Sequence, residues 1–266
     1  MNDVQLVEDE LLREDKDGAV YLTLNRPDKF NTLSESLLAS LQRELDNIAS
    51  DPAVRCVVIA ATGKGFCAGH DLRQMRAHPD HGYYQSLFRS CSGVMQGLVN
   101  LPVPVIARVQ GMATAAGCQL VASCDLAIAA RSATFGVSGI NVGLFCSTPA
   151  VALSRNINAK RAFDMLVTAD FIDADTALDW GLLSGVADDA DLDAAVAAKV
   201  AKILSKSPAA IRFGKAMFHR QRQMSLAEAY ELAGEVMADN MMNADAQEGI
   251  DAFLEKRKPT WEQPGH

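Results

Sequence analysis

Two short loops combine small residues with the start of a predicted helix, and this combination can bind an anionic oxygen. The first is Gly65-Phe66-Cys67-Ala68-Gly69-His70-Asp71-Leu72, and the second is Gly111-Met112-Ala113-Thr114-Ala115-Ala116-Gly117-Cys118-Gln119. Small side chains let a ligand approach the main chain, and the N–H groups at a helix start are free to donate. Two such amides that converge form an oxyanion hole. Either loop taken singly more often indicates tight packing than a site.

Other residues whose types could bind a metal or act as nucleophiles are weaker candidates for a functional site. His78 and His81 have metal-ligand spacing beside Asp80, but no third ligand is evident, so we interpret them as part of a solvated loop. Cys146 and Ser147 could be nucleophiles, yet no general base is visible for either.

Two further polar residues are given structural interpretations. We interpret the side chain of His70 as an incidental surface imidazole, although it could instead point toward a pocket. We expect Asp125 to be a structural partner at the end of a strand.

The elements that carry the loops alternate between strand and helix, which favours an α/β core. Ser34 is a candidate N-cap for a helix whose apolar residues Leu37, Leu38, Leu41, Leu45 and Ile48 form one stripe. The other predicted elements are strands at 19–24, 54–60, 103–109 and 126–129 and helices at 84–99 and 114–122.

The pattern changes after about Asp188, where four helix-like segments follow with no strand candidate between them: 190–205, 208–221, 226–242 and 245–257. We therefore expect a core over residues 1–205 and a helical region over 206–266. The second region contains scattered methionines that fill a core or cover a subunit interface.

Composition excludes several classes of protein. The chain has 266 residues, and 25 basic against 33 acidic residues give a net charge of −8, which disfavours nucleic-acid binding. Apolar stretches are too short for a membrane span. The acidic residues 1–17 do not resemble a signal or transit peptide, so we expect a cytoplasmic location. The 6 cysteines form no CxxC pair and are expected to be buried and reduced.

Together the two loops resemble a known family. Cys67-Ala68-Gly69-His70-Asp71-Leu72 resembles the AGxD loop of the crotonase family, and residues 106–118 followed by Ser123-Cys124-Asp125-Leu126 are similar to the enoyl-CoA hydratase/isomerase signature. The resemblance also covers Leu24-Asn25-Arg26-Pro27 and residues 248–257, so it spans nearly the whole chain.

The resemblance implies a crotonase fold of repeated ββα units, with a C-terminal helical region that builds homotrimers or dimers of trimers, and a place in fatty acid metabolism. It implies an acyl-CoA ligand, without a separate cofactor or metal, whose thioester carbonyl lies between two main-chain N–H groups. Carried over by position, those donors belong to His70 and Ala116. The implied binding residues also include Ala68, Gly69, Asp71 and Gly117. Phe253 and Lys256 correspond to positions near the nucleotide of CoA, although Lys256 also fits a solvated helix end.

The chain departs from the family at two catalytic positions. Family hydratases add water with two glutamates, and the matching positions here hold Gln119 and Gly139. Glutamine cannot accept and return a proton near neutral pH, and glycine has no side chain, so general acid/base catalysis is missing at both points. Gly139 could leave room for bicarbonate as a replacement base, as is thought for a naphthoate-forming member. Asn141 is the nearest polar residue.

Three functions remain open from the sequence. The first is an acyl-CoA enzyme with weak or no hydratase activity that performs isomerisation, hydrolysis or decarboxylation. The second is a non-catalytic acyl-CoA-binding protein. The third is an enoyl-CoA hydratase with displaced catalytic groups. We also expect that glutamates at positions 119 and 139 together would restore hydration.

Overall fold

The computed structural model describes residues 10–261. Its main feature is a sheet with the strand order β1-β2-β3-β4-β6-β9, in which β1 is antiparallel to β2 and all other neighbours are parallel. These strands are β1 Leu11–Lys16, β2 Ala19–Leu24, β3 Cys56–Ala61, β4 Val105–Val109, β6 Leu126–Ala130 and β9 Gly185–Ala187. A second sheet has the order β5-β7-β8, from β5 Ala113–Thr114, β7 Thr134–Gly136 and β8 Ile172–Asp173.

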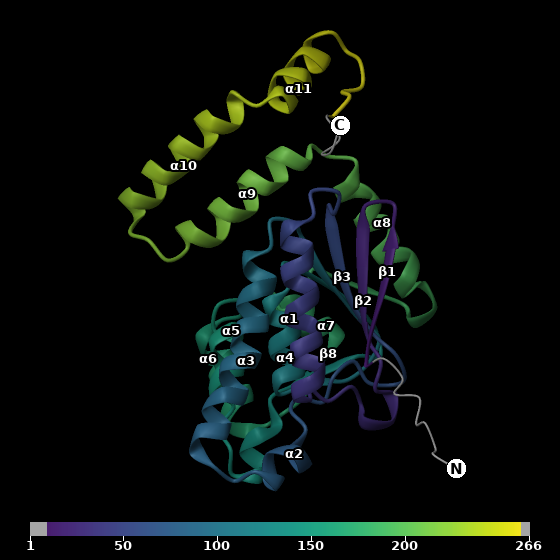
Figure 1. Ribbon diagram of the computed structural model, residues 1–266, viewed down its shortest axis with the longest axis vertical. Coiled ribbons are helices and arrows are strands. Elements are labelled where there is room, and N and C mark those ends of the chain that lie inside the picture. Colours follow the sequence, from purple (N-terminus) through teal and green to yellow (C-terminus); the bar gives the residue numbers. More distant parts are fainter. Residues whose placement is uncertain (1–9, 262–266) are drawn as a thin grey trace, which may run out of the picture.

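Helices cover both faces of the main sheet (Figure 1). The first group is α1 Glu35–Ser50, α2 Leu72–Ala77, α3 His81–Asn100, α4 Ala116–Ser123, α5 Ser147–Leu153, α6 Ala159–Thr168 and α7 Ala174–Trp180. The last group is α8 Leu192–Leu204, α9 Pro208–Gln221, α10 Leu226–Met241 and α11 Ala244–Leu254. Helix α8 packs on one face through Leu192, Val196 and Val200, whereas α1, α3 and α4 pack into the larger core on the other face. The mixed α/β architecture expected from the sequence is confirmed.

Helix α1 shows why the periodic spacing of apolar residues predicted a helix correctly in this part of the chain. The hydroxyl of Ser34 accepts a hydrogen bond from the Leu37 amide at 3.1 Å, which satisfies one of the free N–H groups at the helix start. The five apolar residues of the stripe are all buried. The predicted cap and the predicted face are therefore both confirmed.

The chain around residue 114 differs from the expectation. A helix was expected from residue 114, but residues 113–114 form β5 and the helix begins at Ala116. The two are separated by Ala115, whose φ of 51° lies in the left-handed region. A helix cannot run through that conformation, so the turn delays its start.

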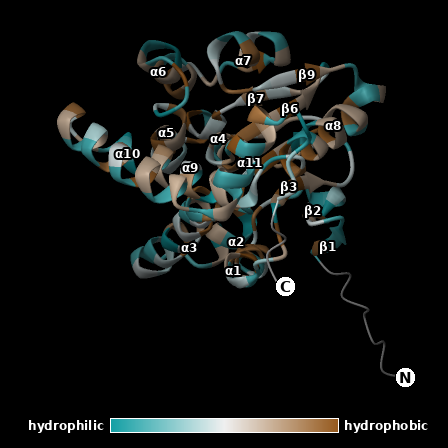
Figure 2. Cartoon of the chain, turned by 90° about the horizontal axis from the view of Figure 1, so that it is seen from above, coloured by the Kyte–Doolittle hydropathy of each residue, from teal (hydrophilic) through white to brown (hydrophobic). Residues whose placement is uncertain are grey.

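The helices after α8 form an arm that projects from the body of the chain (Figures 1 and 2). Helices α9 and α10 pack as an antiparallel pair, and α11 follows. Exposed apolar residues gather on this arm: Phe218, Leu226, Tyr230, Met237, Met241, Met242, Ile250, Phe253 and Leu254. The domain boundary expected at residue 205 stays a prediction. The structure does show the expected change from alternating strands and helices to consecutive helices. Within residues 10–261, no helix is both long and apolar enough to span a membrane.

Candidate functional site

The two loops identified in the sequence lie together at the carboxyl edge of the main sheet. Because β3 and β4 are parallel neighbours, the segments that follow them leave the sheet at the same edge. The amides of Phe66 and Cys67 donate to the Met112 carbonyl at 2.9 and 3.2 Å, and the Thr114 amide donates to the Cys67 carbonyl at 3.0 Å. The loops therefore pair through their main chains.

Two glycines allow this close approach. Gly69 has φ +88°, and a Cβ there would lie 2.9 Å from the Ala115 Cβ and 3.2 Å from the Ala116 nitrogen. A Cβ at Gly117 would lie 2.0 Å from the Cys67 carbonyl oxygen. Any other residue at either position would push the loops apart. The glycines thus bring the first loop against the N-terminus of α4.

The turn at Ala115 leaves amides available at the start of α4. Ala115 has φ 51° and ψ −120°, and its amide donates to the Gly136 carbonyl at 3.0 Å. No side chain caps the helix. Among residues 10–261, neither the Ala116 amide nor the His70 amide donates a hydrogen bond. Two free donors on adjacent loops are thus available to an anionic oxygen.

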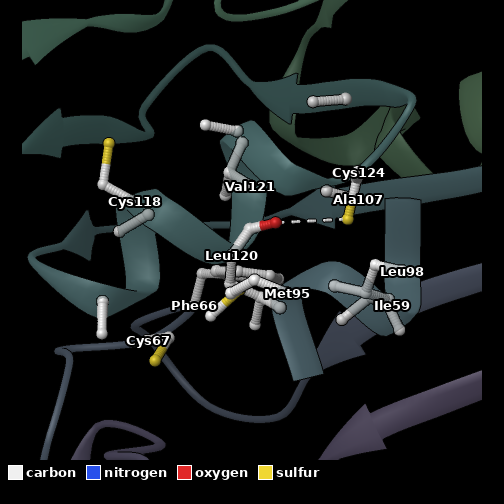
Figure 3. Close-up of a cluster of buried hydrophobic side chains, with 14 of the residues drawn as sticks. Ile59, Phe66, Cys67, Met95, Leu98, Ala107, Cys118, Leu120, Val121 and Cys124 are labelled. Carbon is white, nitrogen blue, oxygen red and sulfur yellow. Dashed lines mark hydrogen bonds between the residues drawn. The ribbon is translucent and has the colours of Figure 1, made fainter. Parts of the chain in front are cut away.

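Helix α4 is anchored by buried apolar and sulfur-containing side chains. Figure 3 shows Phe66 and Cys67 of the first loop beneath α4, together with Leu120 and Met95. The Cys124 thiol donates to the Leu120 carbonyl at 3.3 Å at the end of this helix. All six cysteines are free and buried, as expected. Burial raises the pKa of the Cys67 and Cys118 thiols to about 12, so both stay protonated at neutral pH.

The interpretation of His70 as a surface residue is wrong. Both ring nitrogens are buried, and neither makes a hydrogen bond of good geometry within the described chain, although the ring lies near the Leu33 main chain. The ring lies edge-on to Phe88 of α3, with 5.5 Å between ring centroids. Burial lowers the pKa of His70, and the nearby Leu33 main chain offsets this only in part. The surface interpretation failed because an isolated histidine in a loop has no periodic pattern that reports burial.

Ala68 and Asp71 make hydrogen bonds within the protein that hold the first loop and the start of α2 in place. The Ala68 amide donates to the Phe30 carbonyl at 3.0 Å. The Asp71 carboxylate caps α2 by accepting from the Arg73 and Gln74 amides at 3.1 and 3.2 Å. Asp71 also lies 3.7 Å from the Arg26 guanidinium. Their expected role in binding therefore stays a prediction, and their observed contacts are structural.

The two positions that depart from the family pattern have different surroundings. Gln119 lies one turn into α4, is 4% exposed, and its Oε1 has no hydrogen-bond partner within residues 10–261. Gly139 lies in the short 3-10 helix Ser138–Val142. A Cβ at Gly139 would lie 2.5 Å from the Leu144 carbonyl oxygen and 2.7 Å from the Cys146 Sγ. The space that was expected to admit bicarbonate there is thus occupied along the side-chain direction.

The remaining polar candidates near Gly139 lack activation. Cys146 is buried and burial raises the pKa of its thiol. The Ser147 hydroxyl is exposed and donates to the Phe145 carbonyl at 3.4 Å. Asn141 is exposed. Sequence reasoning missed the hydrogen bond between Thr114 and Ser138, with 3.1 Å between hydroxyl oxygens, because Thr114 on β5 and Ser138 at the start of the 3-10 helix after β7 are remote in sequence.

Other expected site residues are not brought to the loops within one chain. Phe253 is 81% exposed at the end of α11, and Lys256 follows it, whereas α2 and the first loop lie at the opposite end of the long axis (Figure 1). His78 and His81 are exposed, with His78 against Tyr83. In the described part of the chain, no cluster of three or more His, Cys, Asp or Glu residues is placed to hold a metal ion.

Comparisons with known proteins agree with the geometry. Residues 14–264 match the family model described as enoyl-CoA hydratase/isomerase. The chain is 45% identical over 245 residues to the mitochondrial enoyl-CoA hydratase domain-containing protein 3 of Homo sapiens, covering 92% of this chain and 81% of that protein. It is 32% identical to the 1,2-epoxyphenylacetyl-CoA isomerase of Escherichia coli, covering 91% and 94% of the two chains. A solved enoyl-CoA hydratase from Mycobacterium smegmatis is 56% identical, with a TM-score of 0.94 over 96% of this chain and 99% of that one.

The comparisons correct one expectation. Relatives from Homo sapiens, Xenopus laevis and Danio rerio that are 43–45% identical to this chain are named mitochondrial, which contradicts a cytoplasmic location. That expectation rested on the acidic residues 1–17. The composition of one segment shows only that this segment lacks the features of a transit peptide, and it does not specify a compartment.

Proposed function

The chain belongs to the enoyl-CoA hydratase/isomerase family, and we propose that it binds acyl-CoA thioesters with the carbonyl oxygen between the amides of His70 and Ala116. The observation that carries this proposal is the juxtaposition of two unpaired amides across the Gly69 contact. A preorganised donor of this kind typically stabilises an oxyanion by ~3–4 kcal/mol. Two donors favour an enolate or a tetrahedral oxyanion over the ground-state carbonyl.

The proposed activity is an acyl-CoA reaction other than efficient hydration. Gln119 and Gly139 supply no group that can transfer a proton. Each positioned acid or base contributes roughly 10²–10⁴-fold, so losing both removes most of a hydratase's rate. Isomerisation, hydrolysis and decarboxylation use an oxyanion hole without needing two carboxylates on one water. The alternative is a protein that holds acyl-CoA without turning it over.

The proposed assembly is a homotrimer or a dimer of trimers. The apolar residues on α10 and α11 are exposed in one chain and need a cover. Phe253 belongs to α11 and Lys256 follows it, and α11 lies at the opposite end of the long axis from α2, which follows the first loop (Figure 1). We therefore propose that any contact they make with the nucleotide of CoA is with CoA bound to a neighbouring copy.

Calorimetry with Ala116→Pro tests the proposed binding mode. Ala116 is the first residue of α4, a position that tolerates proline, and the substitution removes the N–H and places ring carbons where its hydrogen was. Binding of a saturated acyl-CoA should weaken by at least ~10-fold, whereas binding of free CoA should change little, because only the thioester uses this donor. The matched control is Ala116→Gly, which changes the same residue but keeps the N–H.

Two results would overturn the proposal. One is the absence of acyl-CoA binding by the unmodified protein at millimolar ligand. The other is equal binding by folded Ala116→Pro and Ala116→Gly. A mass-spectrometric screen of short, medium and dicarboxylic acyl-CoAs separates the enzyme from the binding protein, since turnover of any one of them excludes a purely non-catalytic role.

A further inference from the structure

The turn between β2 and α1 is held by one fully buried asparagine. The main-chain amide of Asn31 donates to the Arg26 carbonyl at 2.9 Å, and its Oδ1 accepts from the Arg26 amide at 2.8 Å. Its Nδ2 donates to the carbonyls of Thr62 and Gly65 at 2.8 and 2.9 Å. Asn31 is 0% exposed, so its side chain closes the turn from inside and ties it to the chain that leaves β3.

The backbone of this turn is strained. Phe30 and Asn31 have φ angles of 48° and 52°, in the left-handed region that is unfavourable for residues other than glycine. Asparagine tolerates this region better than most residues, whereas a bulky side chain such as that of Phe30 tolerates it poorly. Such residues persist only where surrounding contacts hold them, and they gather at functional sites. The hydrogen bonds of Asn31 supply those contacts.

The strained turn lies directly on the first loop. A Cβ at Gly65 would lie 3.1 Å from Phe30 Cδ1. Further along the loop, the Ala68 amide donates to the Phe30 carbonyl at 3.0 Å. The turn and the first loop therefore run side by side from Gly65 to Ala68.

One contact between these two segments sets the direction of the proposed donor. The Leu33 amide donates to the Gly69 carbonyl at 2.8 Å. That carbonyl and the His70 N–H belong to one peptide group, which is planar and trans, so they point in opposite directions. The His70 N–H thus points away from the turn. A Cβ at Gly69 would lie 3.2 Å from the Ala116 nitrogen, so this peptide group adjoins the second donor.

We propose that Asn31 is a positioning residue for the oxyanion donor of the first loop, an inference that rests on the proposed function. Its side chain holds the turn, Leu33 of that turn holds the Gly69 carbonyl, and the planar peptide group then fixes the direction of the His70 N–H. A donor stabilises an oxyanion best when it is aimed in advance. Loss of the Asn31 side chain therefore weakens recognition of the carbonyl oxygen and leaves the other contacts of the ligand in place.

A purely structural role of Asn31 would give a different result. If Asn31 only stabilised the fold, its loss would reduce the folded fraction and weaken the apparent binding of every ligand by the same factor. The ratio of two dissociation constants measured on the same sample is free of that factor. This ratio reports the site and not the stability of the chain.

Calorimetry with butyryl-CoA and butyl-CoA measures recognition of the carbonyl oxygen. Butyl-CoA is the thioether, which has the same chain length and the same nucleotide but no carbonyl oxygen. We expect the unmodified protein to prefer butyryl-CoA by at least ~10-fold. Asn31→Gly removes the side chain and permits the positive φ, and it should reduce this preference by at least ~5-fold.

A second variant removes only the donor bonds of Asn31. Asn31→Asp has nearly the same size and keeps an oxygen that accepts from the Arg26 amide, but its carboxylate cannot donate to the carbonyls of Thr62 and Gly65. It should lose the preference for butyryl-CoA as Asn31→Gly does. This variant decides the question if Asn31→Gly folds poorly.

Asn156→Gly is the matched control. The Asn156 Nδ2 also donates to two carbonyls, those of Ala122 and Ala152 at 2.8 Å each, at the end of α4 opposite Ala116. The control loses the same kind of bonds without touching the first loop. It should keep the full preference for butyryl-CoA.

The outcomes separate this inference from the function on which it rests. Equal binding of butyryl-CoA and butyl-CoA by the unmodified protein, or binding of neither, contradicts the proposed function and the inference with it. A clear preference that folded Asn31→Gly and Asn31→Asp both retain contradicts only the role of Asn31. An equal loss of preference in Asn156→Gly would also overturn that role, because the effect would then not be specific to the first loop.

Discussion

The Nζ of Lys215 on α9 lies 2.7 Å from Oδ2 of Asp125, which directly precedes β6. The same ammonium donates to the carbonyls of Leu98 and Val103 at 2.9 and 2.8 Å, so each of its three protons has an acceptor. Asp125 also accepts from the Val105 amide at 2.7 Å, and its Oδ1 lies 2.8 Å from His219 Nε2. The structural role expected for Asp125 is confirmed, and the pair fixes α9 to the core.

Lys215→Met should destabilise the protein by about 3 kcal/mol. The substitution keeps the length of the side chain but leaves the Asp125 carboxylate and two carbonyls without the ammonium, and breaking a buried pair from one side typically costs ~3–5 kcal/mol. Denaturant unfolding at pH 7 measures the change. Lys202→Met, at an exposed lysine of α8, is the matched control and should shift stability by less than about 0.5 kcal/mol. Equal effects of the two variants would show that the pair is not coupled to folding.

Stability should fall as the pH drops below about 6.5, and His70 should contribute to this fall. The folded-state pKa of His70 is lowered by burial, so between that value and 6.5 the unfolded chain binds the proton more readily than the folded one. Stability therefore increases with pH in this window. Denaturant unfolding at several pH values should show a smaller slope for His70→Phe than for the unmodified protein. Parallel curves for the two proteins would contradict the assignment.

Removal of residues 206–266 should leave a core that aggregates. The deletion removes Lys215, so the partly buried Asp125 carboxylate and the carbonyls of Leu98 and Val103 lose their donor. The full chain, by contrast, should be a trimer or hexamer by light scattering at micromolar concentration, because the arm's own apolar residues are exposed in the single chain and an assembly would cover them. A stable monomer of the full chain would contradict this expectation.

Sequence patterns predicted the elements that have a repeating apolar face or a continuous apolar run. The stripe of α1 and the strand β3 were recognised because burial on one face or on both faces leaves a periodic or uniform signature. The second sheet was missed because β5 and β8 have two residues each, which is too short to show any period. Lys215 was missed for a different reason. A single lysine on a helix looks solvated until its distant partner is known.

The candidate site was predictable in its main chain and less so in its side chains. Gly69 and Gly117 indicate close approach because glycine is needed where backbones touch, and the structure places them at such contacts. The burial of the His70 ring and the filled space beside Gly139 depend on α3 and on residues 144–146, which the local sequence does not report.

Hydration of crotonyl-CoA by the unmodified protein should be slow or absent, and the structure changes what the glutamate variants should do. Gln119→Glu is nearly isosteric, but a side chain at position 139 meets the Leu144 carbonyl at 2.5 Å and the Cys146 thiol at 2.7 Å. Even Gly139→Ala should cost about 1–3 kcal/mol through overpacking. The double variant Gln119→Glu/Gly139→Glu should therefore melt earlier and fall short of the ~10²-fold gain that two working carboxylates would produce. Loss of absorbance from the conjugated thioester, measured beside a thermal melt, checks both points. A stable double variant with brisk hydration would show that residues 144–146 move aside. Brisk hydration by the unmodified protein would show that Gln119 and Gly139 do not decide the hydration rate.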